Sequence, residues 1–157
     1  MLTITGVHEC KADAKGRVGI PAPLKKQLQP VLADGFILKR SVFQPCLELH
    51  PMGAWNEVMQ KIGKLNRFVK KNNDFIRLFS AGVKKIELDN QSRILIPKDL
   101  LQHSGIQSDI VMASAIDIIE LWDKNTYEES LRSGAEDFSA LAEEVMGTID
   151  PSSDNVS

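Results

Sequence analysis

The chain has 157 residues, two cysteines and a formal net charge of −2, a length that fits one ordinary domain or two small coupled ones. Two cysteines provide no disulfide framework, and neither a signal peptide nor an apolar run of the roughly 18 residues that span a membrane is evident. We therefore expect a cytoplasmic protein without membrane contacts. Residues 1–98 carry 17 basic and 8 acidic side chains, whereas residues 99–157 carry 2 and 13. This asymmetry favours either a polyanion partner for a basic surface or simply two solvated faces.

The first third of the chain alternates short strands with turns. Residues 7–11 and 17–20 predict two strands around a turn in which Asp13 accepts backbone N–H groups and Gly16 adopts a positive φ. Pro21 and Pro23 introduce a short helix over 24–28. Residues 35–39 and 46–49 predict two more strands.

The middle of the chain predicts a helical connector. Apolar residues recur at helical spacing over 54–70, and Asn72-Asn73 interrupts the pattern before a second short helix over 75–79. We expect the apolar stripe to be buried, and the lysines and arginines on the opposite face to be solvated or to add phosphate contacts.

The next region repeats the order of the first. Residues 84–88 and 93–96 predict strands on either side of a turn, and Pro97 begins a helix that Gly105 ends. Residues 109–113 and 118–122 predict two further strands.

The C-terminal region predicts helices. A short helix covers 123–133, and residues 136–147 form an amphipathic acidic helix able to dock on the protein's own core, a sister subunit or another partner. The final residues, 151–157, are predicted to be disordered.

A short motif occurs twice and identifies an internal repeat. Asp13, Arg17, Ile20 and Pro21 recur 76 positions later as Asp89, Arg93, Ile96 and Pro97, whereas Glu48-Leu49 and Trp55 recur after 72 as Glu120-Leu121 and Tyr127. We infer one supersecondary module used twice, with four residues lost in one loop of the second copy.

Two interpretations of the first turn remain open. Lys15 and Arg17 flank Gly16, and arginine can bind guanine O6 and N7 through two parallel hydrogen bonds while lysine supplies a point charge. Alternatively, Arg17 pairs with Asp13 and only locks the turn.

Enzymatic and metal chemistry find little support in the sequence. No Walker loop, Gly-x-Ser-x-Gly elbow or His-Glu-x-x-His motif is present, so we expect no catalytic residues and no cofactor. His8, Cys10, Cys46 and His50 have the residue types of a zinc site, but they lack a Cys-x-x-Cys knuckle and any equivalents in the second half. We therefore expect no metal, although a small metalloprotein stays an alternative.

The chain resembles the MraZ family over roughly residues 1–133. The resemblance begins with the segment Asp13-Ala14-Lys15-Gly16-Arg17-Val18-Gly19-Ile20-Pro21 and continues through Cys46-Leu47-Glu48-Leu49-His50-Pro51, Phe79-Ser80-Ala81-Gly82, Arg93-Ile94-Leu95-Ile96-Pro97, His103-Ser104-Gly105-Ile106 and Glu120-Leu121-Trp122-Asp123. One such motif is weak evidence, but the ordered set is specific.

The resemblance implies an α+β fold of two SpoVT/AbrB-like swapped-hairpin units related by a pseudo-two-fold. We place these domains at 7–54 and 83–126, with a helical connector at 55–82 and an acidic helix and tail at 127–157.

The resemblance also implies a bacterial transcriptional regulator, a repressor of its own division and cell-wall gene cluster, that acts at the nucleoid. It implies a ring-shaped homo-oligomer on short G-rich direct repeats of double-stranded DNA, with no small-molecule substrate. Carried over by position, Lys15, Gly16, Arg17 and Arg93 are DNA-binding candidates, and Asp13 and Asp89 organise the turns.

Two departures from the family pattern weaken the second turn. Ser92 stands where the family usually has glycine, which predicts a reshaped or strained turn. Gln91 stands at the position equivalent to Lys15, where a cation is possible, so the second turn lacks that charge. We expect this turn to contribute less to DNA binding. The alternative function is an assembly scaffold or protein-interaction module whose acidic helix is the partner site.

Overall fold

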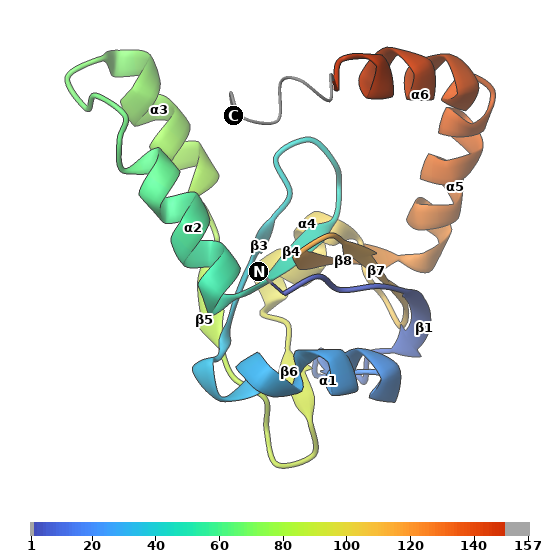
Figure 1. The fold of residues 1–157 in the computed structure, drawn as a ribbon. Coiled ribbons are helices and arrows are strands. Elements are labelled where there is room, and N and C mark those ends of the chain that lie inside the picture. Colours follow the sequence, from blue (N-terminus) through green and yellow to red (C-terminus); the bar gives the residue numbers. More distant parts are fainter. Residues whose placement is uncertain (1, 150–157) are drawn as a thin grey trace. The chain divides into compact units, whose positions relative to one another are not determined.

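The computed structural model describes residues 2–149, so the whole segment predicted to be disordered, 151–157, lies outside the described residues. The described chain forms two compact units with their boundary after Lys124. Helices and antiparallel strands alternate in the first unit, which confirms the α+β class (Figure 1).

The strands are short, and proline or glycine separates several of them. They are β1 (Val7–Lys11), β2 (Arg17–Gly19), β3 (Phe36–Arg40), β4 (Leu47–Pro51), β5 (Lys84–Ile86), β6 (Arg93–Leu95), β7 (Asp109–Ala115) and β8 (Ile118–Asp123). The helices are α1 (Ala22–Leu28), the 3₁₀ helix η1 (Gln29–Asp34), α2 (Met52–Ile62), α3 (Lys70–Phe79), α4 (Lys98–Ser104), α5 (Lys124–Ala135) and α6 (Phe138–Gly147).

The strands form two sheets in which the two sequence repeats interleave. The larger sheet has the order β1-β7-β8-β4-β3-β5, and β2 pairs with β6 in a two-stranded ribbon. Each repeat therefore lends its first strand to the other, because β1 pairs with β7 and the equivalent β5 pairs with β3. This exchange is the swapped-hairpin arrangement that the family resemblance implies.

The strand register is symmetric about equivalent residues. Val18 pairs with Ile94 at the centre of the ribbon, and Glu48 pairs with Glu120 at the centre of the β4–β8 ladder. Both pairs join positions that the internal repeat matches, so a pseudo-two-fold axis relates the halves.

The register also corrects the expectation of one shortened loop. Cys10 pairs with Ile110 in the β1–β7 ladder, and its equivalent in the second repeat, Ile86, pairs with Phe36 in the β5–β3 ladder. Phe36 and Ile110 are therefore equivalent positions, and their offset of 74 lies between the offsets of 76 and 72. The second repeat has therefore lost two residues before β7 and two in the β7–β8 hairpin. The repeated motifs lie before and after this region, so they give the total loss of four residues but not how it is divided between the two loops.

One hydrophobic core serves both repeats. Alternate residues of the four inner strands of the large sheet face Val18 and Ile94 of the ribbon and Leu24 and Leu100 of the short helices, and these side chains are essentially fully buried. Neither repeat encloses this core alone, so the halves fold as one unit.

The connector differs from its prediction. Helix α2 ends at Ile62 rather than continuing to residue 70, and Asn72 and Asn73 lie inside α3 instead of breaking it. The chain turns at 63–69, where the Asn66 side chain accepts the Phe68 N–H at 3.0 Å and the Asn66 carbonyl accepts the Asn72 side-chain N–H at 2.9 Å. The polar side chains of Asn66 and Asn72 therefore stabilise a turn where the apolar stripe predicts continuous helix.

The C-terminal helices agree with the sequence prediction to within two residues at each end. The second unit comprises most of α5 together with α6, and its larger apolar side chains are exposed.

Candidate functional site

The first repeated turn is organised by the carboxylate of Asp13. Its Oδ1 atom accepts the backbone N–H groups of Lys15 and Arg17, both at 2.9 Å, and its Oδ2 atom accepts the Nε–H of Arg17 at 2.7 Å. The Gly16 N–H bonds to the Asp13 carbonyl at 3.0 Å. One carboxylate thus fixes both the backbone of the turn and the arginine side chain that leaves it.

The second turn repeats this network. Asp89 accepts the N–H groups of Gln91 and Arg93 at 2.8 and 3.0 Å, and the Arg93 Nε–H at 2.9 Å. Ser92 has φ 59°, in the same left-handed region as Gly16 at φ 86°. The turn is therefore strained but not reshaped, because the Asp89 bonds hold serine in a conformation that usually favours glycine.

Each turn is also bonded to the opposite repeat. The Gly16 carbonyl accepts the Ile96 N–H at 2.9 Å, and the Ser92 carbonyl accepts the Ile20 N–H at 3.1 Å. A Cβ atom on Gly16 would lie only 2.7 Å from the Ile96 carbonyl oxygen. Close backbone approach therefore explains the glycine in the first turn.

Hydrogen bonding lowers the pKa of both aspartates. The Arg17 backbone N–H is the largest cause for Asp13, and the Arg93 backbone N–H for Asp89; the arginine side chains lower both pKa values further. Both carboxylates are therefore ionised at neutral pH and remain acceptors.

The β2–β6 ribbon places the two arginines on one face. Arg17 pairs with Leu95, and Gly19 pairs with Arg93, while the intervening Val18 and Ile94 are fully buried. Because side chains alternate along strands, Arg17, Leu95, Gly19 and Arg93 share the outer face. A Cβ atom placed on Gly19 would be in ordinary van der Waals contact with the Arg93 stem, whose Cγ lies 4.0 Å away.

The two interpretations of Arg17 left open by the sequence are compatible. Asp13 and Asp89 bind the arginines through Nε, and within residues 2–149 no ion pair or hydrogen bond is recorded for the Nη atoms of either guanidinium. The side chains are 37% and 28% exposed. Each arginine is thus held at its base and presents its terminal nitrogens outwards.

Lys15 and Gln91 occupy equivalent places in the two turns. Both donate a backbone N–H to the aspartate two residues earlier, and both are exposed. The first turn therefore adds a cation that the second lacks.

A buried polar cluster lies on the face of the large sheet opposite the core and was not anticipated from the sequence. The Lys39 Nζ atom is 3.7 Å from Glu48 Oε1 and 4.3 Å from the centre of the Phe79 ring, and it donates to the Arg40 carbonyl. Glu48 also contacts His50 Nε2 at 3.0 Å. Lys39 pairs with Glu48 across the β3–β4 ladder. Predicting this contact requires the register of the two strands, which the sequence alone does not give.

These contacts alter the pKa values of the cluster. Burial lowers the pKa of Lys39. For Glu48, burial is opposed by the hydrogen bond from His50 and by the charge of Lys39, which together lower its pKa. The arrangement fixes the β3–β4 hairpin beneath α3.

The residues considered as zinc ligands do not come together. His8 and Cys10 lie on β1, whereas Cys46 and His50 lie at β4, and β7 and β8 separate these strands. Among residues 2–149, no three His, Cys, Asp or Glu side chains form a group that could hold a metal ion. Burial raises the pKa of Cys10 to about 11 and of Cys46 to about 12, which disfavours the thiolate form that binds metals.

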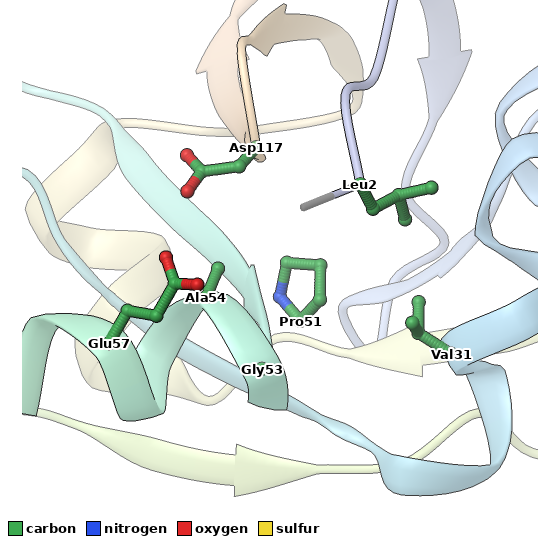
Figure 2. A pocket seen from close by; sticks show the side chains of 7 residues that line it. All are labelled: Leu2, Val31, Pro51, Gly53, Ala54, Glu57 and Asp117. Atoms are coloured by element: carbon green, nitrogen blue, oxygen red, sulfur yellow. The ribbon is translucent and has the colours of Figure 1, made fainter.

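A small pocket lies beside the start of α2. It has a volume of about 130 Å³, and Figure 2 shows the carboxylates of Glu57 and Asp117 beside it with apolar residues around them. Small-molecule sites usually enclose roughly 300–1,000 Å³. This pocket is therefore too small to define a ligand site.

The fold and the two turns define a class of protein: a duplicated, strand-swapped α+β module with paired Asp–Arg turns. The MraZ family model, described as "MraZ protein, putative antitoxin-like", matches residues 3–78 and again 79–148. The chain therefore belongs to the MraZ family, as the sequence resemblance predicts.

Named relatives agree with this assignment. A "Transcriptional regulator MraZ" of Christiangramia forsetii is 57% identical over 96% of this chain and 97% of the relative, and one of Flavobacterium psychrophilum is 60% identical over 95% of each. A third, of Pediococcus pentosaceus, is 31% identical over 90% of this chain and 95% of the relative. This is a family of transcriptional regulators and not of enzymes. In the described part of the chain no helix is long and apolar enough to cross a membrane.

Proposed function

We propose that this protein is a sequence-specific DNA-binding regulator that reads short G-rich direct repeats in the promoter of its own division and cell-wall gene cluster. In this proposal it represses that cluster and acts at the nucleoid, in the cytoplasm. The regions 7–54 and 83–126 supply the two turns, 55–82 connects them, and 127–157 is the acidic extension.

The observation that carries the proposal is the outer face of the β2–β6 ribbon. Arg17 and Arg93 lie on this one face, and an aspartate fixes each of them through Nε. A two-stranded ribbon fits the major groove, where paired guanidinium nitrogens match the O6 and N7 atoms of guanine. Arginines fixed before binding lose less rotamer freedom on contact, which favours affinity.

The spacing of the arginines suits two bases that are two steps apart in a DNA strand. Arg17 lies opposite Leu95 and Arg93 lies opposite Gly19, so the two arginines are two residues apart along the ladder. At about 3.4 Å per residue this separation is about 7 Å, close to two steps of about 3.4 Å in a DNA strand.

The other residues of the turns have supporting roles. Lys15 is positioned to contact a phosphate, and Gly16 allows the backbone to approach closely. Asp13 and Asp89 are turn-organising residues rather than contacts, since their carboxylates are occupied by hydrogen bonds within each turn. Gln91 gives the second turn no equivalent of Lys15, so we expect it to contribute less.

A ring-shaped homo-oligomer explains how so small a contact becomes specific. One ribbon reads only a few base pairs, but linked copies on direct repeats raise the effective concentration of every further contact. Direct repeats match subunits that follow one another head to tail around a ring.

The test measures binding to the upstream DNA of the gene by fluorescence anisotropy across a salt series, with scrambled DNA alongside. We expect tight, steeply salt-dependent binding to the upstream DNA. Arg17→Lys keeps the charge but not the paired donors, so it should lose about 1–3 kcal/mol per site on specific DNA with little change in the salt slope.

The control is Lys85→Ala, which removes one exposed cation from edge strand β5. It should leave the preference for the upstream DNA intact. Equal affinity of the wild-type protein for both DNAs, unaltered by Arg17→Lys, would rule out sequence-specific reading by this face.

A second candidate function is a protein-interaction module. The observation that favours it is the exposure of Leu131, Phe138, Leu141 and Met146 on α5 and α6, each more than half exposed. A variant in which polar residues replace these four side chains tests whether the two functions are separate. Specific DNA binding equal to that of the wild type would show that this apolar surface is not needed to read DNA.

A further inference from the structure

A second cavity lies between the C-terminal end of β3, helix α3 and the last turn of α4. Its volume is about 340 Å³, inside the range of roughly 300–1,000 Å³ that small-molecule sites enclose. The size that excludes a ligand from the pocket beside α2 therefore does not exclude one here. We name this space the β3 cavity.

The lining of the β3 cavity combines basic groups with an apolar wall. The basic side chains are Lys39, Arg40 and His103, and the wall comes from α3 through Phe75, Leu78 and Phe79. The ring centres of Phe75 and Phe79 are 5.6 Å apart. No acidic residue is among the described residues that line the cavity. This lining suits a molecule with an anionic group on an apolar body.

Arg40 has no partner within residues 2–149. Its Nε atom is buried without an acceptor, and no ion pair or hydrogen bond is recorded for its guanidinium. A buried N–H without an acceptor is destabilising, and an oxyanion in the cavity would supply that acceptor. The guanidinium is held against the backbone of Gly82, where a Cβ atom would lie only 3.2 Å from Arg40 Nε.

The other two basic groups differ from Arg40. The Lys39 side chain is 1% exposed and shares its charge with Glu48 at 3.7 Å. Its Nζ atom also lies 4.3 Å from the ring centre of Phe79, so it supports the apolar wall. His103 is exposed on α4 and adds a ring N–H. The uncompensated positive charge of the cavity therefore comes from Arg40.

The acidic side chains of the two helices around the cavity already have cationic partners. Asp74 is the one acidic residue of α3, and it pairs with Lys70 at 2.9 Å and with Arg77 at 2.8 Å. Asp99 is the one acidic residue of α4, and it lies 3.8 Å from Lys84. Neither carboxylate lines the cavity or compensates Arg40.

The internal repeat provides a comparison for each of these positions. The strand register relates β3 to β7 by 74 positions, and the turn motif relates the flanking segments by 76. The equivalent residues are Lys39 and Ala113, Arg40 and Ser114, His103 and Gln27, and Gly82 and Gly6.

In the other half of the molecule, the equivalent residues bond to one another. Ser114 donates its hydroxyl and its backbone N–H to the Gly6 carbonyl, at 2.7 and 3.0 Å. The Gln27 side chain accepts the Thr5 N–H at 2.9 Å and donates to the Thr5 carbonyl at 2.8 Å. These neutral groups satisfy each other, so that half leaves no polar group waiting for a ligand.

The strand pairing beside the β3 cavity is also shorter. The β1–β7 ladder includes the pair of Val7 with Ala113, whereas the β5–β3 ladder, within residues 2–149, lacks the equivalent pair of Val83 with Lys39. The cavity therefore lies where the pseudo-two-fold symmetry is broken. At this place basic side chains, one of them without a partner, replace groups that bond to each other.

We propose that the β3 cavity binds a small organic oxyanion, a carboxylate or phosphate group on an apolar body. The Arg40 guanidinium binds the oxyanion through its N–H donors, His103 donates a ring N–H to it, and the apolar body lies against Phe75 and Phe79. This binding requires neither DNA nor a second copy of the chain, so its test is separate from that of the proposed function.

The test is calorimetric titration of the full-length protein with four probes. Phenyl phosphate and phenylacetate carry the two kinds of oxyanion on an aromatic ring, phenylacetamide carries no charge, and inorganic phosphate has no apolar body. We expect the tighter of the two aromatic anions to bind at least about tenfold more tightly than phenylacetamide and inorganic phosphate. The order of phenyl phosphate and phenylacetate identifies the preferred oxyanion.

Variants locate the binding. Arg40→Gln should weaken the tighter anion by at least about tenfold, and Arg40→Lys, which keeps the charge, should retain part of the affinity. The matched control is Arg77→Gln, which removes an exposed arginine of α3 that does not line the cavity. It should bind like the wild type.

Two readouts separate binding from a structural role of Arg40. The tighter anion should raise the melting temperature of the wild type but not of Arg40→Gln, since only a bound ligand stabilises by mass action. His103→Gln changes an exposed side chain, so the fold should persist while affinity falls several-fold. The ring of Trp55 stacks on Phe79 at 5.9 Å, so binding should also change tryptophan fluorescence in a saturable way.

Three outcomes would overturn the proposal. The first is the absence of heat and of stabilisation with both aromatic anions at millimolar concentrations. The second is equal affinity for phenylacetamide, or binding that Arg40→Gln and His103→Gln leave unchanged, because the probe would then occupy another surface. The third is a change in the sedimentation of Arg40→Gln without binding of any probe, which would give the guanidinium a protein partner instead of a small ligand.

Discussion

At the scale of single residues, the two turns show how one side chain determines a backbone conformation. A tight turn leaves N–H groups without partners, and Asp13 and Asp89 each accept two of them while also binding an arginine. Asparagine retains one acceptor oxygen, but it loses the second acceptor and the negative charge. The aspartates are therefore not interchangeable with their amides.

This requirement predicts a pH-dependent stability. The pKa values of Asp13 and Asp89 are lowered in the folded state, so the stabilisation is present above the ordinary aspartate pKa of about 4 and is lost as the pH falls through the folded values. We expect the melting temperature of the wild type to exceed that of Asp13→Asn with Asp89→Asn at pH 7, and the difference to narrow at pH 3. Asp34→Asn, an exposed aspartate outside both turns, is the control. A difference that is constant with pH would contradict this account.

Gly16 and Ser92 provide a second, reciprocal prediction. Ser92 is left-handed at φ 59°, and L residues with a side chain are strained there by roughly 1–2 kcal/mol. Ser92→Gly relieves this strain at the expense of greater unfolded-state freedom, so we expect a stabilisation of up to about 1 kcal/mol in urea unfolding.

Gly16→Ser should do the opposite and destabilise by more than about 1 kcal/mol. The new Cβ would lie 2.7 Å from the Ile96 carbonyl and 3.0 Å from the Leu101 side chain, in addition to the unfavourable φ. Stability changes of the same sign and size for Ser92→Gly and Gly16→Ser would contradict the expected strain at Ser92 and the expected clash at Gly16.

At the scale of elements, the sequence predicts the helix ends that proline and glycine determine locally, but not the contacts that depend on strand register. Pro97 is the N-cap residue of α4, one position earlier than the helix start at Lys98, and Gly105 ends the helix with φ 69° as the sequence predicts. The sequence pattern does not indicate the bend at 63–69, because the apolar stripe continues through it; the turn is formed by the hydrogen bonds of Asn66. The Lys39–Glu48 pair and the common face of Arg17 and Arg93 depend on strand register, which no local pattern specifies.

The end of α4 allows a direct test of a glycine cap. Within residues 2–149, and apart from the adjacent residues and the backbone of the same helix, no heavy atom lies within 4 Å of a Cβ built on Gly105 or on Gly53 of α2, so both sites accept alanine without a clash. Gly105→Ala should destabilise the protein by about 1 kcal/mol because the left-handed conformation disfavours alanine. Gly53→Ala should stabilise it by up to about 1 kcal/mol because its helical backbone favours alanine. Thermal unfolding of the two variants measures both effects, and two shifts of the same sign would contradict the assignment.

At the scale of the whole molecule, tandem repeats in the sequence form a single intertwined structure. Strand β1 pairs with β7 and β5 pairs with β3, so each repeat supplies an edge strand to the other. The central Val18–Ile94 and Glu48–Glu120 pairs join equivalent positions. The chain is therefore a covalently linked pseudo-dimer, and its halves gain their stability from each other.

Cutting the chain after Gly82 tests this dependence, since the cut lies between α3 and β5. Residues 1–82 alone keep the β3–β4 hairpin, but β1 loses β7, β2 loses β6, β3 loses β5 and β4 loses β8, so we expect no cooperative unfolding transition in dilute solution. Because the pseudo-two-fold joins equivalent positions, the fragment can pair only with a second copy of itself, and any transition should then shift to higher temperature with concentration. Adding residues 83–149 should restore a one-to-one complex with cooperative unfolding. A concentration-independent transition in the first fragment would instead mean that each repeat is a domain able to fold alone, and that the shared sheet is a docking contact between two finished cores.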